Sequence, residues 1–205
     1  MSGAPPVRVA VMASGSGTNL QALLDALNGA PDAPARVTRV VSNRADAGAL
    51  DRARRAGVQA VTLADPADAG QCLAALGDAQ LVVLAGYLKL VPAAVVSRFR
   101  WRMINIHPAL LPDFGGPGMY GDRVHQAVLA SGARESGASV HYVTEEYDRG
   151  AVIAQARVPV RPGDTPDALA ARVLTAEHRL LPRVVIALAY LGLPSRAVRL
   201  EDTKE

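Results

Sequence analysis

Residues 7–27 read VRVAVMASGSGTNLQALLDAL, and this stretch decides the fold. Val7–Ala13 is an apolar run broken by one charge, which is typical of a strand buried on both faces of a parallel sheet. A glycine-rich turn follows, and the apolar residues of Leu20–Leu27 then recur at helical spacing until Asn28-Gly29 ends the pattern. A buried strand, a tight turn and an amphipathic helix are the opening unit of an α/β protein.

The same alternation of strand and helix continues to residue 107. Asp46 is placed to cap a helix that runs through Ala56, a short helix follows Asp68, and Pro92 stands at the first position of another. Strands alternating with helices at this spacing indicate an open, twisted, mostly parallel sheet of Rossmann-like type, with helices on both faces. The expected strands are Val37–Val41, Gln59–Leu63, Leu81–Ala85 and Met103–His107.

The pattern changes after His107. Residues 108–121 are rich in glycine and proline and predict a long loop, followed by a helix over Asp122–Ala130. A hairpin with a polar turn and a long helix, capped by Thr165, running to about Tyr190 and kinked at Pro182, complete the chain. We expect one domain over residues 1–205 with loose ends at 1–6 and about 195–205. The hairpin strands are expected at Ala138–Val143 and Ala151–Val160.

Composition excludes several classes of protein. The single cysteine, Cys72, excludes an internal disulfide framework and a cysteine-based metal cluster, and it is expected to be a core residue. The four histidines lack the spacing of metal ligands, and the net charge of +3 comes without a basic run suited to nucleic acid. No segment has the length of a membrane span or the pattern of a signal peptide, so a cytoplasmic protein is expected.

The glycine turn is the first candidate site. A strand that turns tightly into a helix presents free amide groups and the positive end of the helix dipole to an anion. The dinucleotide fingerprint fails because Leu20 stands where the third glycine is needed, and the P-loop pattern fails because no Lys-Ser/Thr follows. What remains is either a site for one phosphate, built with Thr18 and Asn19, or an ordinary turn between strand and helix.

The second candidate is the strand end Ile104-Asn105-Ile106-His107-Pro108. Residues two apart in a strand point to the same side, so Asn105 and His107 share one face. Ligands of open α/β sheets bind at the carboxyl ends of the strands, which is where this pair lies. The alternative is a histidine that is only hydrogen-bonded near the surface.

Two acidic segments complete the candidates. The turn Thr144–Gly150 carries three carboxylates, and Asp148 before Gly150 suggests a tight turn, although such turns are usually solvated hairpin tips. Glu177 lies on the last helix among apolar residues and therefore needs a partner, either internal or a ligand hydroxyl. His125 is expected to be structural or exposed, and the role of His141 stays open.

Taken in order, these motifs resemble the phosphoribosylglycinamide formyltransferases, folate-dependent enzymes of purine biosynthesis. The resemblance extends from about Val7 to Tyr190 and is most specific in two segments, residues 104–112 (INIHPALLP) and residues 137–143 (GASVHYV) followed by Asp148-x-Gly150. It also covers residues 14–20 (SGSGTNL), 41–43 (VSN) and 84–87 (LAGY). The resemblance implies the formyltransferase fold and transfer of the formyl group of 10-formyltetrahydrofolate to the amine of 5-phosphoribosylglycinamide.

The resemblance also assigns residues to roles. It implies that Asn105, His107 and Asp148 are catalytic and that Glu177 contacts the ribose. The phosphate of the ribonucleotide falls on Gly17, Thr18 and Asn19, and the folate falls on Leu88, Lys89, Leu90 and Val91 and on Thr144, Glu145, Glu146 and Tyr147. Two positions depart from the family pattern: Lys89 stands where some members have arginine, and Leu174 where a polar residue is common.

The implied chemistry is acyl transfer without a metal. Donors from Asn105 and a protonated His107 would stabilise the oxyanion of the tetrahedral intermediate, and Asp148 would raise the pKa of His107 and assist proton transfer. The expected partners are the two small-molecule substrates, in a monomer or a homodimer. Two rival functions stay open, namely hydrolysis of formyltetrahydrofolate and a nucleotide-binding module without catalysis.

Overall fold

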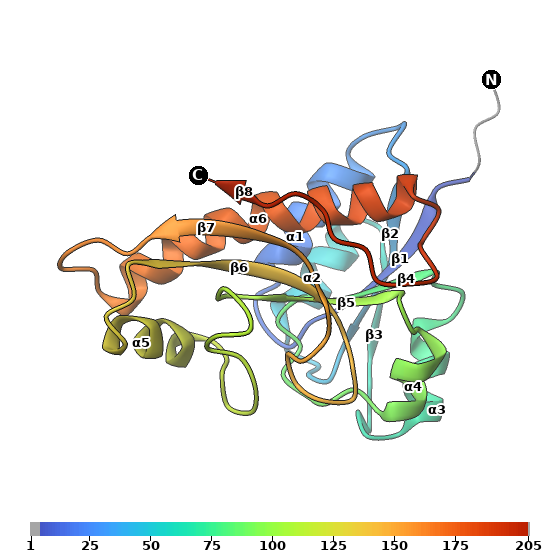
Figure 1. Cartoon of the computed structure of the whole chain (residues 1–205). Helices are drawn as coiled ribbons and strands as arrows, with labels where there is room; N and C mark the ends of the chain where they lie inside the picture. The colour runs from blue at the N-terminus through green and yellow to red at the C-terminus, as the bar shows by residue number, and fades with distance from the viewer. Residues whose placement is uncertain (1–4, 205) are drawn as a thin grey trace.

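All strands of the computed structural model, which describes residues 5–204, belong to one sheet (Figure 1). The strand order is β3-β2-β1-β4-β5-β6-β7-β8. Pairing is parallel from β3 across to β5, antiparallel between β5, β6 and β7, and parallel again between β7 and β8. The strands are β1 (Val7–Met12), β2 (Ala35–Ser42), β3 (Gln59–Thr62), β4 (Leu81–Leu84), β5 (Met103–His107), β6 (Glu135–Tyr142), β7 (Val152–Pro159) and β8 (Thr203–Lys204).

Helices cover both faces of the sheet, as predicted, because successive residues of the central strands point to opposite sides. Val9 and Val11 of β1 belong to one apolar cluster, which they share with α1, α2 and α6, whereas Ala10 and Met12 pack with α3 and α4 in a second cluster. Cys72 is fully buried in the second cluster, as expected. The helices are α1 (Thr18–Leu23), η1 (Leu24–Asn28), α2 (Gly48–Arg55), α3 (Ala69–Leu76), α4 (Ala93–Arg98), α5 (Asp122–Ala130) and α6 (Pro166–Tyr190).

Several helix termini differ from the prediction. Asp46 does not cap α2: its carboxylate pairs with the Arg44 guanidinium, and Ala47 occupies the cap position without a side-chain bond. Pro92 lies one residue before α4, in an extended conformation, rather than inside its first turn. By contrast, Thr165 caps α6 as predicted, and the helix expected after Asp68 is present with Asp68 as its cap, because each side chain accepts from free amides of the first turn.

Two longer segments also differ. The helix expected over residues 20–27 changes from α to the wider π form at Leu24, so η1 continues α1 up to Gly29. Of the ends expected to be loose, residues 1–4 lie outside the described residues, but the C-terminal segment is docked: the Leu200 amide donates to the Ile153 carbonyl over 2.7 Å, and Val198 and Leu200 pack on the core. Helix α6 runs through Pro182 without interruption.

The parallel strands position the site. The segments that follow the carboxyl ends of β1, β4 and β5 meet at one edge of the sheet, and the turn between β6 and β7 lies against the same edge. Within the described range 5–204, no helix has both the length and the apolar character needed to cross a membrane.

Candidate active site

Strand pairing brings an amide and an imidazole together. In the antiparallel ladder between β5 and β6, Asn105 lies directly opposite His141 and His107 opposite Ser139. The Asn105 Nδ2 atom lies 3.0 Å from His141 Nε2. His141 Nδ1 donates to the carbonyl oxygen of Tyr142 over 2.9 Å, which fixes the ring with Nε2 toward the Asn105 amide. His141, whose role the sequence left open, therefore orients Asn105.

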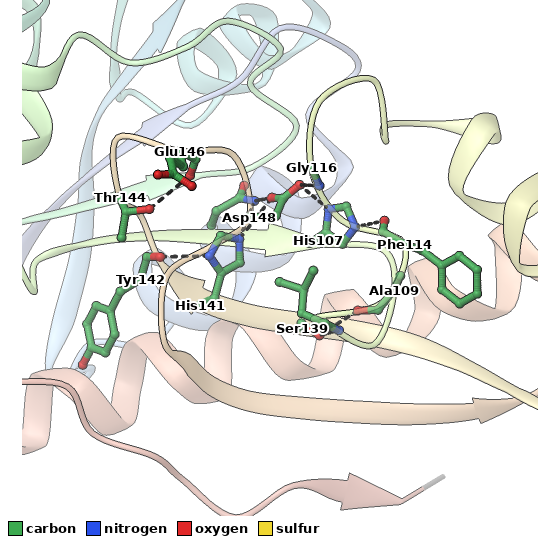
Figure 2. Close-up of polar contacts among 12 residues, drawn as sticks. His107, Ala109, Phe114, Gly116, Ser139, His141, Tyr142, Thr144, Glu146 and Asp148 are labelled. Atoms are coloured by element: carbon green, nitrogen blue, oxygen red, sulfur yellow. Dashed lines mark hydrogen bonds and ion pairs between the residues drawn. The ribbon is translucent and has the colours of Figure 1, made fainter.

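Asp148 joins these groups from the turn between β6 and β7 (Figure 2). Its carboxylate lies 3.6 Å from His107 Nδ1 and 3.4 Å from His141 Nε2, and it accepts a long hydrogen bond of 3.4 Å from Asn105 Nδ2. Burial raises the pKa of the Asp148 carboxyl, but its contacts with His141, His107 and an amide together lower it below its usual value. An ionised carboxylate therefore stands beside both imidazoles.

The turn that carries Asp148 has little steric freedom. Asp148 adopts a left-handed backbone with φ of 54°, and a Cβ atom at Gly150 would collide with the carbonyl oxygen of Tyr142. The tight turn predicted from Asp148-x-Gly150 is thus present, and only glycine fits at position 150. The sequence favours a solvated acidic tip, but the Asp148 side chain is only 10% exposed and points inward.

The loop after β5 covers His107. The Nε2 atom of His107 donates to the Phe114 carbonyl over 2.9 Å, and the Gly116 amide donates to Asp148 Oδ2 over 2.9 Å (Figure 2). These contacts leave the His107 side chain only 4% exposed. The sequence predicted a long loop here but gave no sign that its backbone would bond the two proposed catalytic side chains.

The electrostatics of His107 differ from the prediction. Burial lowers the pKa of His107 by more than the negative charge of Asp148 and the Phe114 carbonyl raise it, so the pKa lies below 6.5. The expectation that Asp148 would keep this imidazole protonated is therefore wrong for the covered state. The physical reason is desolvation of the buried ring, which disfavours the imidazolium.

A cleft of about 450 Å³ connects this cluster with the end of the first strand. Asn19 and Glu177 lie in its wall, and the Asn19 amide donates to Glu177 Oε2 over 2.7 Å. The Oδ1 atom of Asn19 is buried and has no partner, so it is available to a ligand donor. The catalytic candidates and the two acidic segments singled out from the sequence thus share one cavity.

Most of the residues predicted to bind substrates line this cleft. Gly17, Thr18 and Glu145 do not, and Glu145 is exposed. Gly17 has φ of 74°, and a Cβ atom there would lie 2.7 Å from Ala49 Cα, so the loop needs glycine for its close approach to α2. The predicted residues in the wall are Asn19, Leu88, Lys89, Leu90, Val91, Asn105, His107, Thr144, Glu146, Tyr147, Asp148 and Glu177.

Two residues that were not predicted from the sequence as site residues contribute to the cleft or to the glycine turn. His125, on the first turns of α5, is buried with an unpartnered Nδ1 atom and lines the cleft. Arg52 of α2 donates to the Ser16 carbonyl over 2.8 Å and braces the glycine turn, while burial, and after it the Arg52 charge, lowers the pKa of His178. Their helical positions are unremarkable in sequence, and only the packing of α2, α5 and α6 reveals them.

Glu177 makes folding depend on pH. Burial raises its pKa from 4.5 to about 7, which the hydrogen bond from Asn19 offsets only in part. The folded protein then holds a proton that the unfolded chain releases, so the stabilisation is complete below pH 4.5 and is lost as the pH rises through about 7. Glu177→Gln, which keeps an acceptor for Asn19, should remove this dependence.

The measurement is the free energy of unfolding in urea at pH 5 and pH 8 for both proteins. Relative to Glu177→Gln, the free energy of unfolding of the unmodified protein should fall by up to roughly 3 kcal/mol between pH 5 and pH 8. Glu145→Gln, a change at an exposed position, serves as the matched control and should parallel the parent. A difference between parent and Glu177→Gln that stays constant with pH would contradict the assignment.

Comparison with known proteins relates the chain to one family. Residues 7–185 match the family model described as formyl transferase. The chain is 43% identical to the chloroplastic phosphoribosylglycinamide formyltransferase of Arabidopsis thaliana, over 88% of this chain and 65% of that protein, and 41% identical to the phosphoribosylglycinamide formyltransferase of Escherichia coli, over 87% and 85%. It therefore spans slightly less than two thirds of the plant relative.

Solved structures agree with the fold. Glycinamide ribonucleotide transformylase 1 from Symbiobacterium toebii is similar with a TM-score of 0.84 and 42% identity, covering 96% of this chain and 95% of that one. A formyltetrahydrofolate deformylase from Pseudomonas syringae is also similar, with a TM-score of 0.83, but at 25% identity and over only 65% of its own length. Both confirm the predicted open α/β sheet with helices on its two faces.

Proposed function

Because the chain belongs to the formyl transferase family, we propose that it transfers the formyl group of 10-formyltetrahydrofolate to the amine of 5-phosphoribosylglycinamide, a step of de novo purine biosynthesis. One observation carries the proposal: a single cleft contains both the Asn105–His107–Asp148 cluster and the Asn19–Glu177 pair beside the glycine turn. Formyl transfer between two substrates needs a reactive centre and a separate binding site for the acceptor substrate, and this cleft contains candidates for both.

We assign the chemistry to three side chains. The substrate amine attacks the formyl carbon, a new C–N bond forms, and the carbonyl oxygen becomes an oxyanion. The bond from that carbon to N10 of the folate then breaks, and the proton lost by the amine is delivered to N10. Asp148 is ionised and lies beside His107, so this pair is suited to carry the proton, while Asn105 and the His107 ring donate to the oxyanion.

The hydrogen bonds of the structure without substrate indicate which contacts a bound substrate must replace. Nε2 of His107 donates to Phe114 in the covered state, and the weaker of the two Asn105 contacts is the 3.4 Å bond to Asp148. Both donors become available to an oxyanion if the loop backbone moves off His107 and the long bond is exchanged. We therefore propose that the loop over residues 113–121 moves when substrates bind.

The acceptor is proposed to bind through backbone and acid groups. Helix α1 begins at Thr18 without a side-chain cap and without an acidic residue in its first turn. No side-chain acceptor or negative charge therefore competes with a phosphate for the free amides of this turn. Glu177 and the unpartnered Asn19 Oδ1 are suited to receive hydrogen bonds from a ribose diol. Leu174 lines the cleft without adding a polar group, so the backbone carries the phosphate contact.

The folate is proposed to lie along Leu88–Val91 and the turn Thr144–Tyr147. Leu88 and Leu90 are 52% and 50% exposed, an unusual exposure for leucines and one that suits contact with an aromatic ring system. Lys89, between them, supplies a point charge for a carboxylate without the planar fork of arginine. The formyl folate acts as a cosubstrate.

Hydrolysis of formyltetrahydrofolate is the second candidate, favoured by the structural likeness to a deformylase. Water would replace the amine as nucleophile and the same three side chains would serve. A hydrolase has no need of the glycine turn or of the pairing between Asn19 and Glu177, which is why we prefer transfer.

The test is an assay of folate turnover with and without glycinamide ribonucleotide. Transfer predicts that release of tetrahydrofolate depends on the amine and that the product carries the formyl group. Turnover at the same rate without the amine, with formate as product, would establish hydrolysis instead. Glu177→Ala separates the two further, because it should raise the KM for the amine substrate while leaving a hydrolase unaffected.

A further inference from the structure

A second cavity lies at the opposite edge of the sheet from the proposed active site. This arginine groove, of about 390 Å³, is formed by the start of β1 and by the turns that lead into β4 and β5. Arg8, Arg98 and Arg102 line it together with Asp78 and the buried Phe99. Strands of four to six residues separate it from the active-site edge, a distance of about 13–20 Å.

The arginine groove carries excess positive charge. A fourth cation, Arg39, lies against its wall, because a Cβ atom at Gly77 would be 2.5 Å from the Arg39 guanidinium carbon. One carboxylate, Asp78, faces these cations: it is 3.0 Å from Arg8 Nε and 3.8 Å from Arg39 Nε. Helices α3 and α4 end nearby, and their dipoles contribute roughly half a negative charge each. About two positive charges remain uncompensated.

Two of the arginines lack acidic partners. Arg98 and Arg102 flank the Phe99 ring, with guanidinium carbons 5.8 and 5.7 Å from its centroid. Arg102 donates one hydrogen bond to the Arg98 carbonyl, and among residues 5–204 neither guanidinium forms an ion pair with a carboxylate. Guanidinium groups that lie over an aromatic ring keep free donors in a planar fork, the geometry that phosphate oxygens match.

We propose that the arginine groove binds a compact phosphate-bearing dianion, at a site separate from the glycine turn. A charge of about minus two would balance the groove, and the open donors of Arg98 and Arg102 supply directed hydrogen bonds. The groove is bounded by the turns at Gly77–Gln80 and Phe99–Arg102, which suits a compact phosphate-bearing anion rather than an extended polyanion.

The experiment titrates the protein with inorganic phosphate at pH 8. Binding is monitored through amide chemical shifts in NMR, which report on each edge of the sheet separately. We expect saturable shifts of the Gly77–Gln80 amides. Arg98→Gln combined with Arg102→Gln should weaken this binding by about tenfold or more per arginine and leave shifts at Gly15–Asn19 unchanged. Asp78→Asn should strengthen it, an effect that a merely structural role of Asp78 would not produce.

Arg55→Gln is the matched control, because Arg55 is exposed and, like Arg98, lies in the last turn of its helix. It should leave phosphate binding at the groove unchanged. The proposal is overturned if the Gly77–Gln80 amides do not respond to phosphate. It is also overturned if Arg55→Gln weakens phosphate binding as much as the combined replacement of Arg98 and Arg102. It is also overturned if only a polyanion such as heparin produces the shifts. None of these outcomes bears on formyl transfer, which the amine-dependence assay tests separately.

Discussion

His107→Ala should reduce kcat by about 10³-fold or more. The side chain is proposed both to donate to the oxyanion and to pass on a proton, effects that typically contribute about 10²–10³ and 10²–10⁴. His107 lies in β5 at the carboxyl edge of the sheet, so the strand fixes the position of its ring. The measurement is single-turnover transfer from formyl folate to glycinamide ribonucleotide, with substrate binding determined separately.

Two companions make the His107 experiment decisive. His107→Gln keeps a side-chain donor for the Phe114 carbonyl, so it should retain the fold and the loop contact yet remain strongly impaired. Melting temperatures of both variants check that activity, and not folding, is lost. Near-normal turnover by either folded variant would refute the assigned mechanism and support a binding module without catalysis.

Asp148→Asn should lower kcat by about 10²–10³-fold while leaving the affinity for both substrates close to that of the parent. The amide oxygen of asparagine can still accept from Gly116, but the negative charge beside His107 and His141 is lost. Without that charge, the proton released by the attacking amine has no anionic acceptor in the cluster.

Asp113→Asn is the control for Asp148, because Asp113 is an exposed carboxylate of the covering loop that does not line the cleft. It should have nearly unchanged kcat and KM. If Asp148→Asn raised KM and left kcat intact, the carboxylate would be a binding group and the proton-transfer role would be wrong. Equal losses in the two variants would indicate a general effect of charge near the cleft.

The alternation of buried strands and helices made the sheet predictable. Leu81–Ala85 is apolar throughout and Val7–Ala13 is apolar apart from Arg8, a pattern that favours a buried parallel strand. The pairing of Asn105 with His107 followed from the two-residue period of a strand and is present in the structure. Local, short-range rules were therefore sufficient for these features.

Features that depend on distant contacts were not predictable. Asp148 lies 43 residues from Asn105, and its burial depends on the register of β5 against β6 and on the loop after β5. Burial also reverses the expected net shift in the pKa of His107, because the sequence contains the charge of Asp148 but does not show that the folded chain removes the ring from water. Likewise, the Asp46 carboxylate pairs with the Arg44 guanidinium and does not cap the helix that it was expected to cap.

The docked C-terminal segment has a consequence for how molecules of this protein behave together. An unpaired outer strand offers a row of amide and carbonyl groups to a neighbour and invites edge-to-edge aggregation. Along β7, Leu200 bonds Ile153, the Asp202 carboxylate accepts from the Gln155 amide over 3.0 Å, and β8 pairs with residues 156 and 157. Residues 200–204 thus cover the outer edge of β7 and keep it from pairing with a second chain.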